Sequence, residues 1–300
     1  MSFTEEIRDH LCQQYIKNKC CRKALIYGAL YSCITEDREI RFSTDNENTA
    51  HLIRNLIKNV YSCDIEYDIY DKLTRSGEAS AAYKLLPSDE LTEAVKDDML
   101  SSGGLNTELF VCENCKSCFV RGLFISDGTI NDPENGYHLE FSISDDIKRE
   151  NVIVFLEEQG FSVRSTVRRG VGSIYVKESE TIMDILTYIG ASKYSLEIMN
   201  LKIKKSIINN ENRRRNCDMA NLSKSIDASL QLSDAIKRMI SDNKLDGLGE
   251  QLKCTALLRL ENPELSLKEL ASIHVPAISK SGLSHRFDKI MNYYNSIYNE

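Results

Sequence analysis

Apolar residues recur at helical spacing in several segments of the chain, most clearly in Lys116–Asn131. There Phe119, Leu123 and Phe124 form one stripe, which Gly122 interrupts, and the pattern ends at Asp127. A glycine inside a helix costs about 1 kcal/mol relative to alanine, and a common compensation is the close approach of another backbone. The pattern therefore predicts a helix that packs against a partner helix.

A second apolar segment, CRKALIYGALYSCI at 21–34, supplies that partner and indicates an internal duplication. Three of its residues precede their counterparts by the same 94 positions: Cys21 and Cys115, Gly28 and Gly122, Cys33 and Asp127. The later elements repeat as well. The first half is predicted to have an extended run at 39–44, a helix at 47–61 and strands at 63–70 and 79–86. The second half is predicted to have a strand at 137–144, a helix at 146–160 and strands at 162–168 and 173–176. A helical segment closes each half.

Two helices that meet at glycines, each heading an α-β-β-α-β-β-α half, resemble the LAGLIDADG homing-endonuclease fold. The two motifs read IYGALYSCI at 26–34 and VRGLFISDG at 120–128. With RGLFISDGTINDPENGYHLEF, the chain resembles the WhiA family of bacterial DNA-binding regulators. That resemblance implies an α+β fold, a duplicated LAGLIDADG-like domain followed by an all-α helix-turn-helix domain. It also implies control of cell division, chromosome segregation and, in spore formers, sporulation.

The motif ends bear on whether the chain is an enzyme. In LAGLIDADG nucleases each motif helix ends in an acidic residue, and the two acids hold the divalent ions that drive phosphodiester cleavage. Here Asp127 is matched by Cys33, although Glu36 and Asp37 lie nearby in the sequence. We interpret Asp127 as a helix-ending residue and expect an inactive scaffold, not an enzyme. An active metal-dependent endonuclease is the alternative hypothesis.

Three cysteines at two-residue gaps, Cys112, Cys115 and Cys118, have a spacing typical of zinc or iron–sulfur sites. Such sites usually need four ligands, and the nearest further candidate downstream is His138, in a predicted strand. We interpret these cysteines as small buried apolar residues and expect no cofactor. A metal-sensing or redox-sensing role of these cysteines is the alternative hypothesis.

Charge is distributed unevenly along the chain. The net charge is −7, but residues 201–300 contain 16 Lys plus Arg and 12 Asp plus Glu, a net of +4, which leaves −11 for the first 200. Because phosphate binding depends on local Lys and Arg, the DNA-binding surface is expected in the C-terminal part. No apolar run reaches the roughly 18 residues of a membrane helix, and the start is too polar for a signal peptide. We expect a cytoplasmic, nucleoid-associated protein that does not bind membranes.

A helix-turn-helix pattern occupies about 266–298. Ser266-Leu-Lys-Glu269 predicts a capping box, Val275–Ile278 a linker, and 279–297 an amphipathic helix whose outer face is polar and basic. The string SLKELASIHVPAISKSGLSHRFDKI resembles the C-terminal signature of the WhiA family.

These patterns predict two domains and a set of contacts with double-stranded DNA. The first domain is expected at 1–210, with halves at about 1–100 and 105–195 and a linking helix at 195–210, and the second at 212–300. Other transcription factors or RNA polymerase components are expected partners of the LAGLIDADG-like domain. The candidate DNA contacts are Arg213, Arg214, Arg215, Ser266, Lys268, Ser279, Lys280, Ser281, Ser284, His285, Arg286 and Lys289. Of these, position favours His285 as a base reader and Lys289 as a phosphate contact.

Overall fold

The computed structural model describes residues 2–35, 39–73, 79–99 and 104–298. It divides into two compact units, Met1–Lys205 and Ser206–Glu300, and each unit is described by itself. Among the described residues, no helix combines the length and the apolarity needed to cross a membrane.

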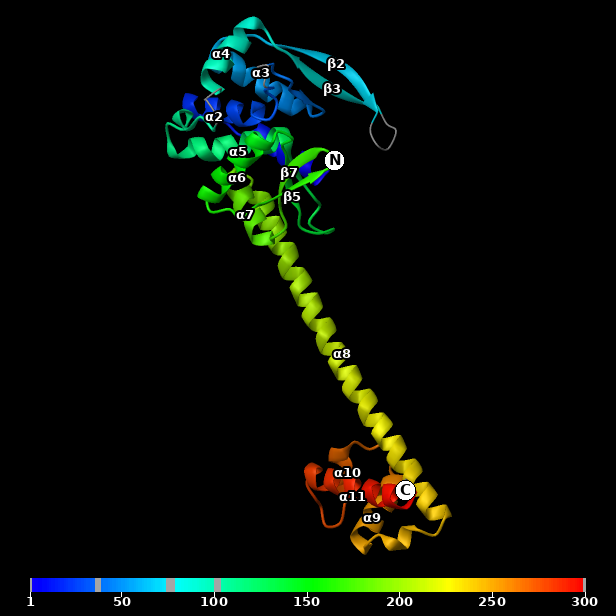
Figure 1. Cartoon of the computed structure of the whole chain (residues 1–300). Helices are drawn as coiled ribbons and strands as arrows, with labels where there is room; N and C mark the ends of the chain where they lie inside the picture. Colours follow the sequence, from blue (N-terminus) through cyan, green and yellow to red (C-terminus); the bar gives the residue numbers. More distant parts are fainter. Residues whose placement is uncertain (1, 36–38, 74–78, 100–103, 299–300) are drawn as a thin grey trace. The chain divides into compact units, whose positions relative to one another are not determined.

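The first unit contains the expected duplication (Figure 1). Its first half has a three-stranded antiparallel sheet in the order β1-β3-β2, and its second half has a four-stranded antiparallel sheet in the order β4-β5-β7-β6. The elements of the first half are α2 (Lys19–Leu30), β1 (Ser43–Thr44), α3 (Glu47–Tyr61), β2 (Glu66–Leu73), β3 (Ala79–Leu86) and α4 (Asp89–Met99). Those of the second half are α5 (Glu113–Asp127), β4 (Gly128–Ile130), β5 (Leu139–Ser142), α6 (Asp146–Glu158), β6 (Arg164–Arg168), β7 (Val171–Val176) and α7 (Ser179–Tyr188).

The helices α2 and α5 lie side by side at the centre of this unit, and their glycines set the distance between them (Figure 1). A Cβ atom on Gly28 would lie 2.0 Å from the carbonyl oxygen of Phe119, and one on Gly122 would lie 2.1 Å from the carbonyl oxygen of Leu25. The two backbones are therefore in direct contact. The predicted partner helix is confirmed, and one apolar core continues through both halves.

The N-terminal helix α1 (Phe3–Cys12) joins the two halves. Its Thr4 hydroxyl is paired with the backbone of Ile130 in the second half, and its Asp9 carboxylate accepts a hydrogen bond from Asn46 in the first. Apolar residues at four-residue steps, Phe3, Ile7, Leu11 and Tyr15, predict an amphipathic helix here. The helix stops at Cys12, so Tyr15 lies beyond its end and is 86% exposed, and that part of the prediction is wrong.

Several predicted boundaries differ from the structure. The run at 39–44 forms strand only at Ser43–Thr44, and β4 was not expected. The helix α2 ends at Leu30, three residues before Cys33, whereas α5 continues to Asp127. Glu36 and Asp37, and the predicted link at 101–104 apart from Gly104, lie outside the described residues.

The predicted end of a helix near Asn209–Asn212 is not observed, because α8 runs without a break from Ser192 to Ser241. Asparagine has a modest helix propensity, which the favourable neighbours of a long helix can outweigh. Most of the apolar residues that recur at helical spacing along α8 are exposed. They include Leu196, Met199, Ile203, Ile207, Leu222, Ile226 and Leu230.

The second unit is helical throughout its described residues, apart from turns. The end of α8 packs with α9 (Glu250–Glu261), α10 (Leu267–Ile273) and α11 (Lys280–Tyr298). Their shared core contains Leu232, Ile236, Met239, Leu245, Leu248, Ala256, Leu270, Ala271, Leu283, Phe287 and Ile290. This core holds α10 and α11 as two successive helices joined by a short connection.

Candidate nucleic-acid interface

The start of α10 is fixed by the predicted capping box. The Glu269 amide donates to Ser266 Oγ at 3.3 Å, and the Ser266 amide donates to Glu269 Oε2 at 2.9 Å. These bonds satisfy two backbone donors that a helix start otherwise leaves unpaired. The Ser266 hydroxyl is thus engaged in capping, while Lys268 is exposed on the first turn.

The connection between α10 and α11 is organised around His274, which is only 4% exposed. Its Nε2 lies 3.0 Å from Thr255 Oγ1 and 3.0 Å from an Arg286 guanidinium nitrogen, and its Nδ1 lies 3.1 Å from the Pro276 carbonyl oxygen. Because guanidinium only donates, we assign Nε2 as the acceptor and place the proton on Nδ1, which donates to Pro276. The network ties α9, the connection and α11 together.

Arg286 therefore faces the interior of the second unit. It also donates to Thr255 Oγ1 at 3.2 Å, so one guanidinium nitrogen serves two acceptors. The sequence placed Arg286 among the candidate DNA contacts, at the border of the apolar stripe. Its position in the structure is suited to orienting α11, whereas His285, its neighbour in sequence, is exposed.

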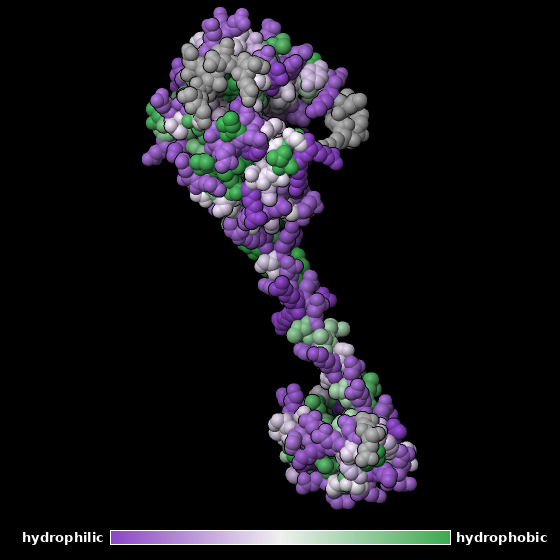
Figure 2. All heavy atoms as spheres, in the orientation of Figure 1, coloured by the Kyte–Doolittle hydropathy of each residue, from purple (hydrophilic) through white to green (hydrophobic). Residues whose placement is uncertain are grey.

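The outer face of α11 presents Ser281, His285 and Lys289, all exposed, on the side opposite the buried residues Leu283, Phe287 and Ile290. Lys280 is exposed at the first turn, and Ser279 caps the helix by accepting a hydrogen bond from the Gly282 amide at 3.0 Å. The visible face of this unit is mostly hydrophilic (Figure 2). The free amides of a helix start and two lysines can bind phosphate, and imidazole and hydroxyl groups can bind base edges.

Ser284 lies on a different side of α11. It is half-buried and lines a pocket of about 210 Å³, which Ser266 and Leu267 of the α10 region and Ser229 of α8 also line. The structure thus groups the candidates of the helix-turn-helix into an exposed set on α11 and a pair that lines this pocket, Ser266 and Ser284.

Arg213, Arg214 and Arg215 are all exposed on the continuous helix α8. Successive residues of a helix are rotated by about 100°, so three consecutive arginines point in three directions. At most two of them can face one flat surface such as a DNA backbone.

The C-terminal end of α5 and the turn after α2 line an open pocket of about 600 Å³ in the first unit. Ser32 donates to Asp127 Oδ2 at 2.5 Å, and burial raises the pKa of Asp127 to about 6. Burial also raises the pKa of the Cys33 thiol to about 11, which keeps it neutral and a poor ligand for Mg²⁺ at neutral pH. Asp145 lines the same pocket, and its carboxylate caps α6 by accepting from the Lys148 amide at 2.9 Å.

Asp127→Asn should stabilise the first unit at neutral pH. The folded pKa of about 6 lies above the unfolded value near 3.9, so the folded state holds the proton more tightly and loses stability as pH rises from about 4 to 6. Asparagine keeps an acceptor for Ser32 without the buried charge, so we expect a gain of roughly 1–2 kcal/mol above pH 6 and little gain near pH 4. Urea unfolding at pH 4 and pH 8 measures both values. An asparagine variant less stable than wild type at pH 8 would contradict this account.

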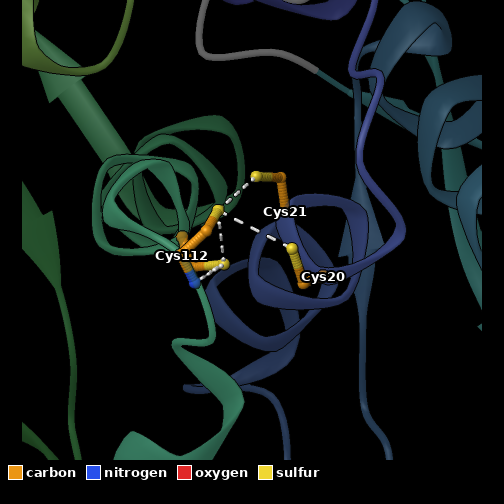
Figure 3. Close-up of side chains that lie close together, drawn as sticks. Cys20, Cys21 and Cys112 are labelled. Atoms are coloured by element: carbon orange, nitrogen blue, oxygen red, sulfur yellow. Dashed lines mark hydrogen bonds between the residues drawn. The ribbon is translucent and has the colours of Figure 1, made fainter.

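The cysteine run at 112–118 does not act as one group in the structure. Cys112 and Cys115 lie with Cys20 and Cys21 at the starts of α5 and α2. Figure 3 shows Cys112 facing Cys20 and Cys21. Cys118 is not one of these four, although its side chain contacts Cys21. The spacing along the chain did not indicate Cys20 and Cys21. The constant offset that pairs Cys21 with Cys115 was a signal for Cys21, and Cys20 is its neighbour in sequence.

Known proteins similar to this chain match both of its units. Residues 116–208 match the WhiA LAGLIDADG-like domain family, and residues 211–294 match the WhiA C-terminal HTH domain family. A probable cell division protein WhiA from Syntrophomonas wolfei is 32% identical over 314 residues, with all of both chains covered. One from Ruminiclostridium cellulolyticum is 31% identical, with 97% of this chain and 96% of the relative covered. The crystal structure of full-length WhiA from Thermotoga maritima shares the fold, with a TM-score of 0.57, 22% identity and 99% of both chains covered.

The duplicated glycine-helix domain, the helix-turn-helix that follows it and full-length relatives above 30% identity together show that this chain belongs to the WhiA family of cell division proteins.

Proposed function

We propose that this protein is a sequence-specific DNA-binding regulator in which α11 reads the major groove of double-stranded DNA. The observation that carries the proposal is the exposed polar and basic face of α11, which stands opposite a fully packed apolar stripe in a helix-turn-helix unit. In such a unit the second helix enters the groove, and its N-terminal residues meet the bases. The network of His274, Thr255 and Arg286 supports the proposal by fixing the orientation of α11.

The first unit, in this proposal, is a scaffold without nuclease activity. Two observations support this: Cys33 stands where the matching motif has Asp127, and its thiol is buried and neutral. Two carboxylates line the pocket at this helix pair: burial raises the pKa of Asp127 to about 6, and Asp145 is engaged in capping α6. A divalent ion that activates a hydroxide and stabilises a leaving oxygen needs more negative charge than this from its ligands.

We further propose that the protein regulates cell division and chromosome segregation and, in spore formers, sporulation. Other transcription factors or RNA polymerase components are the proposed partners of the first unit, and a DNA-bound regulator would be found at the nucleoid. The relatives from Syntrophomonas wolfei and Ruminiclostridium cellulolyticum are probable cell division proteins, which supports the proposed role in cell division. The proposed domain limits remain 1–210 and 212–300.

The full chain should enrich one DNA motif from a random duplex library. Direct readout of base edges by one recognition helix selects sequence, whereas phosphate contacts alone do not. The measurement is repeated selection followed by sequencing and a binding titration on the enriched duplex. The same protein, incubated with plasmid DNA and Mg²⁺ or Mn²⁺, should leave the plasmid intact.

Two outcomes would contradict the proposal. Binding without enrichment of any motif would mean that the protein coats DNA and does not read it. Plasmid cleavage that disappears in Asp127→Ala would assign the first unit to the active endonucleases.

A further inference from the structure

Four cysteine thiols converge where α2 and α5 begin (Figure 3). Cys20 and Cys21 belong to the first turn of α2, Cys112 is the residue that precedes α5, and Cys115 belongs to its first turn. The four Sγ atoms all lie within 4.8 Å of one another. Cys112 Sγ is 3.6 Å from Cys20 Sγ, 3.4 Å from Cys21 Sγ and 3.4 Å from Cys115 Sγ.

Four sulfurs this close together can surround one metal ion. Sulfurs that share one zinc ion, with Zn–S bonds of about 2.3 Å, are separated by about 3.8 Å. A disulfide would require about 2.05 Å, and the cysteines of this chain are free thiols. An iron–sulfur cluster distributes its cysteine sulfurs over several iron atoms, so it needs a wider set of ligands than this one.

The surroundings of the thiols favour a bound cation. The Cys20 thiol is directed at Cys112 Sγ, and the Cys112 amide approaches Cys115 Sγ at 3.5 Å. Cys21 and Cys115 are buried, with 4% and 0% of their surface exposed. A bound cation would compensate the charge of thiolates held in such a buried place.

We propose that Cys20, Cys21, Cys112 and Cys115 bind one Zn²⁺ ion with four Sγ–Zn bonds. Each thiol releases its proton to solvent, and no electron is transferred, because Zn²⁺ has no redox chemistry in proteins. Four thiolates close the coordination shell, which is the arrangement of a structural site and leaves no position for a substrate. The ion would clamp the N-terminal ends of α2 and α5, at the opposite end of the helix pair from Asp127. Each half of the duplication contributes two ligands.

The experiment uses the full chain with Cys217→Ser and Cys254→Ser, because these two exposed thiols could scavenge metal. Purified under reducing conditions from cells supplied with zinc, this protein should contain one zinc per chain by elemental analysis. Adding Cys112→Ser or Cys20→Ser should remove at least nine-tenths of it. Cys118→Ser is the matched control, since Cys118 is buried in α5 outside the four, and it should retain the full zinc content.

A second measurement does not depend on the variants folding. Cobalt exchanged into the unmutated chain should give the charge-transfer and visible bands of tetrahedral thiolate coordination, and zinc should displace it. Removal of zinc by a strong chelator should lower the unfolding temperature of the chain, and returning zinc should restore it.

Three results would overturn the proposal. One is metal-free protein whose four thiols all react with a thiol reagent or whose Cys21 and Cys112 form a disulfide. Another is iron with inorganic sulfide in place of zinc. The last is an equal loss of zinc from the Cys118→Ser control.

Discussion

Gly122→Ala is expected to unfold or severely destabilise the first unit. The new methyl group would lie 2.1 Å from the Leu25 carbonyl oxygen and 2.7 Å from the Ala29 amide nitrogen. Both are backbone atoms, so no side-chain rotation can relieve the clash, and α2 and α5 must separate. Overpacking a core commonly costs about 1–3 kcal/mol, and a forced shift of two central helices should cost at least roughly 3 kcal/mol.

The sign of this effect is diagnostic. In an exposed helix the same substitution stabilises by about 1 kcal/mol, because alanine has the higher helix propensity. Urea unfolding of the variant measures the difference, and Gly104→Ala in the same unit is the control, since a Cβ there meets nothing within 4 Å. A Gly122→Ala variant at least as stable as wild type would mean that the helix contact is looser than described.

His285→Ala and Lys289→Ala should weaken DNA binding in two different ways. Both side chains are exposed on the outer face of α11, one turn apart. If imidazole reads a base edge, its loss should cost roughly 1–3 kcal/mol on the preferred duplex and relax the preference, with little effect on random DNA. If the lysine binds phosphate, its loss should weaken binding to all sequences. It should also make the slope of log K against log salt concentration shallower by about one unit.

A salt titration on the preferred and on a random duplex separates the two behaviours. Lys237→Ala is a matched control for charge, because Lys237 is exposed on α8, outside the helix-turn-helix. This control variant tests whether the lower net charge alone explains a loss of DNA affinity. Unchanged affinity and slope in both α11 variants, with circular dichroism showing that they are folded, would mean that α11 is not the reader.

Local patterns in the sequence determined much of this protein. The capping box at Ser266, the amphipathic spacing of α11 and the paired glycines each follow from physical rules that act within a few residues or at one constant offset. The duplication predicted that α2 and α5 meet, and the structure confirms a direct backbone contact at Gly28 and Gly122. The alternation of helices and strands also defined both halves, with errors mainly at strand ends such as β1.

Only the tertiary structure decided which side chains meet across long stretches of chain. Arg286 lies beside His285 in sequence, yet burial of His274 and Thr255 draws its guanidinium inward while His285 stays exposed. The sequence spacing grouped Cys112, Cys115 and Cys118. In the structure, the packing of two helix starts brings Cys112 and Cys115 together with Cys20 and Cys21 instead. Spacing along a chain reports the face of one element, whereas a site with ligands from two elements also depends on how their surfaces pack. Here two glycines without side chains set that packing.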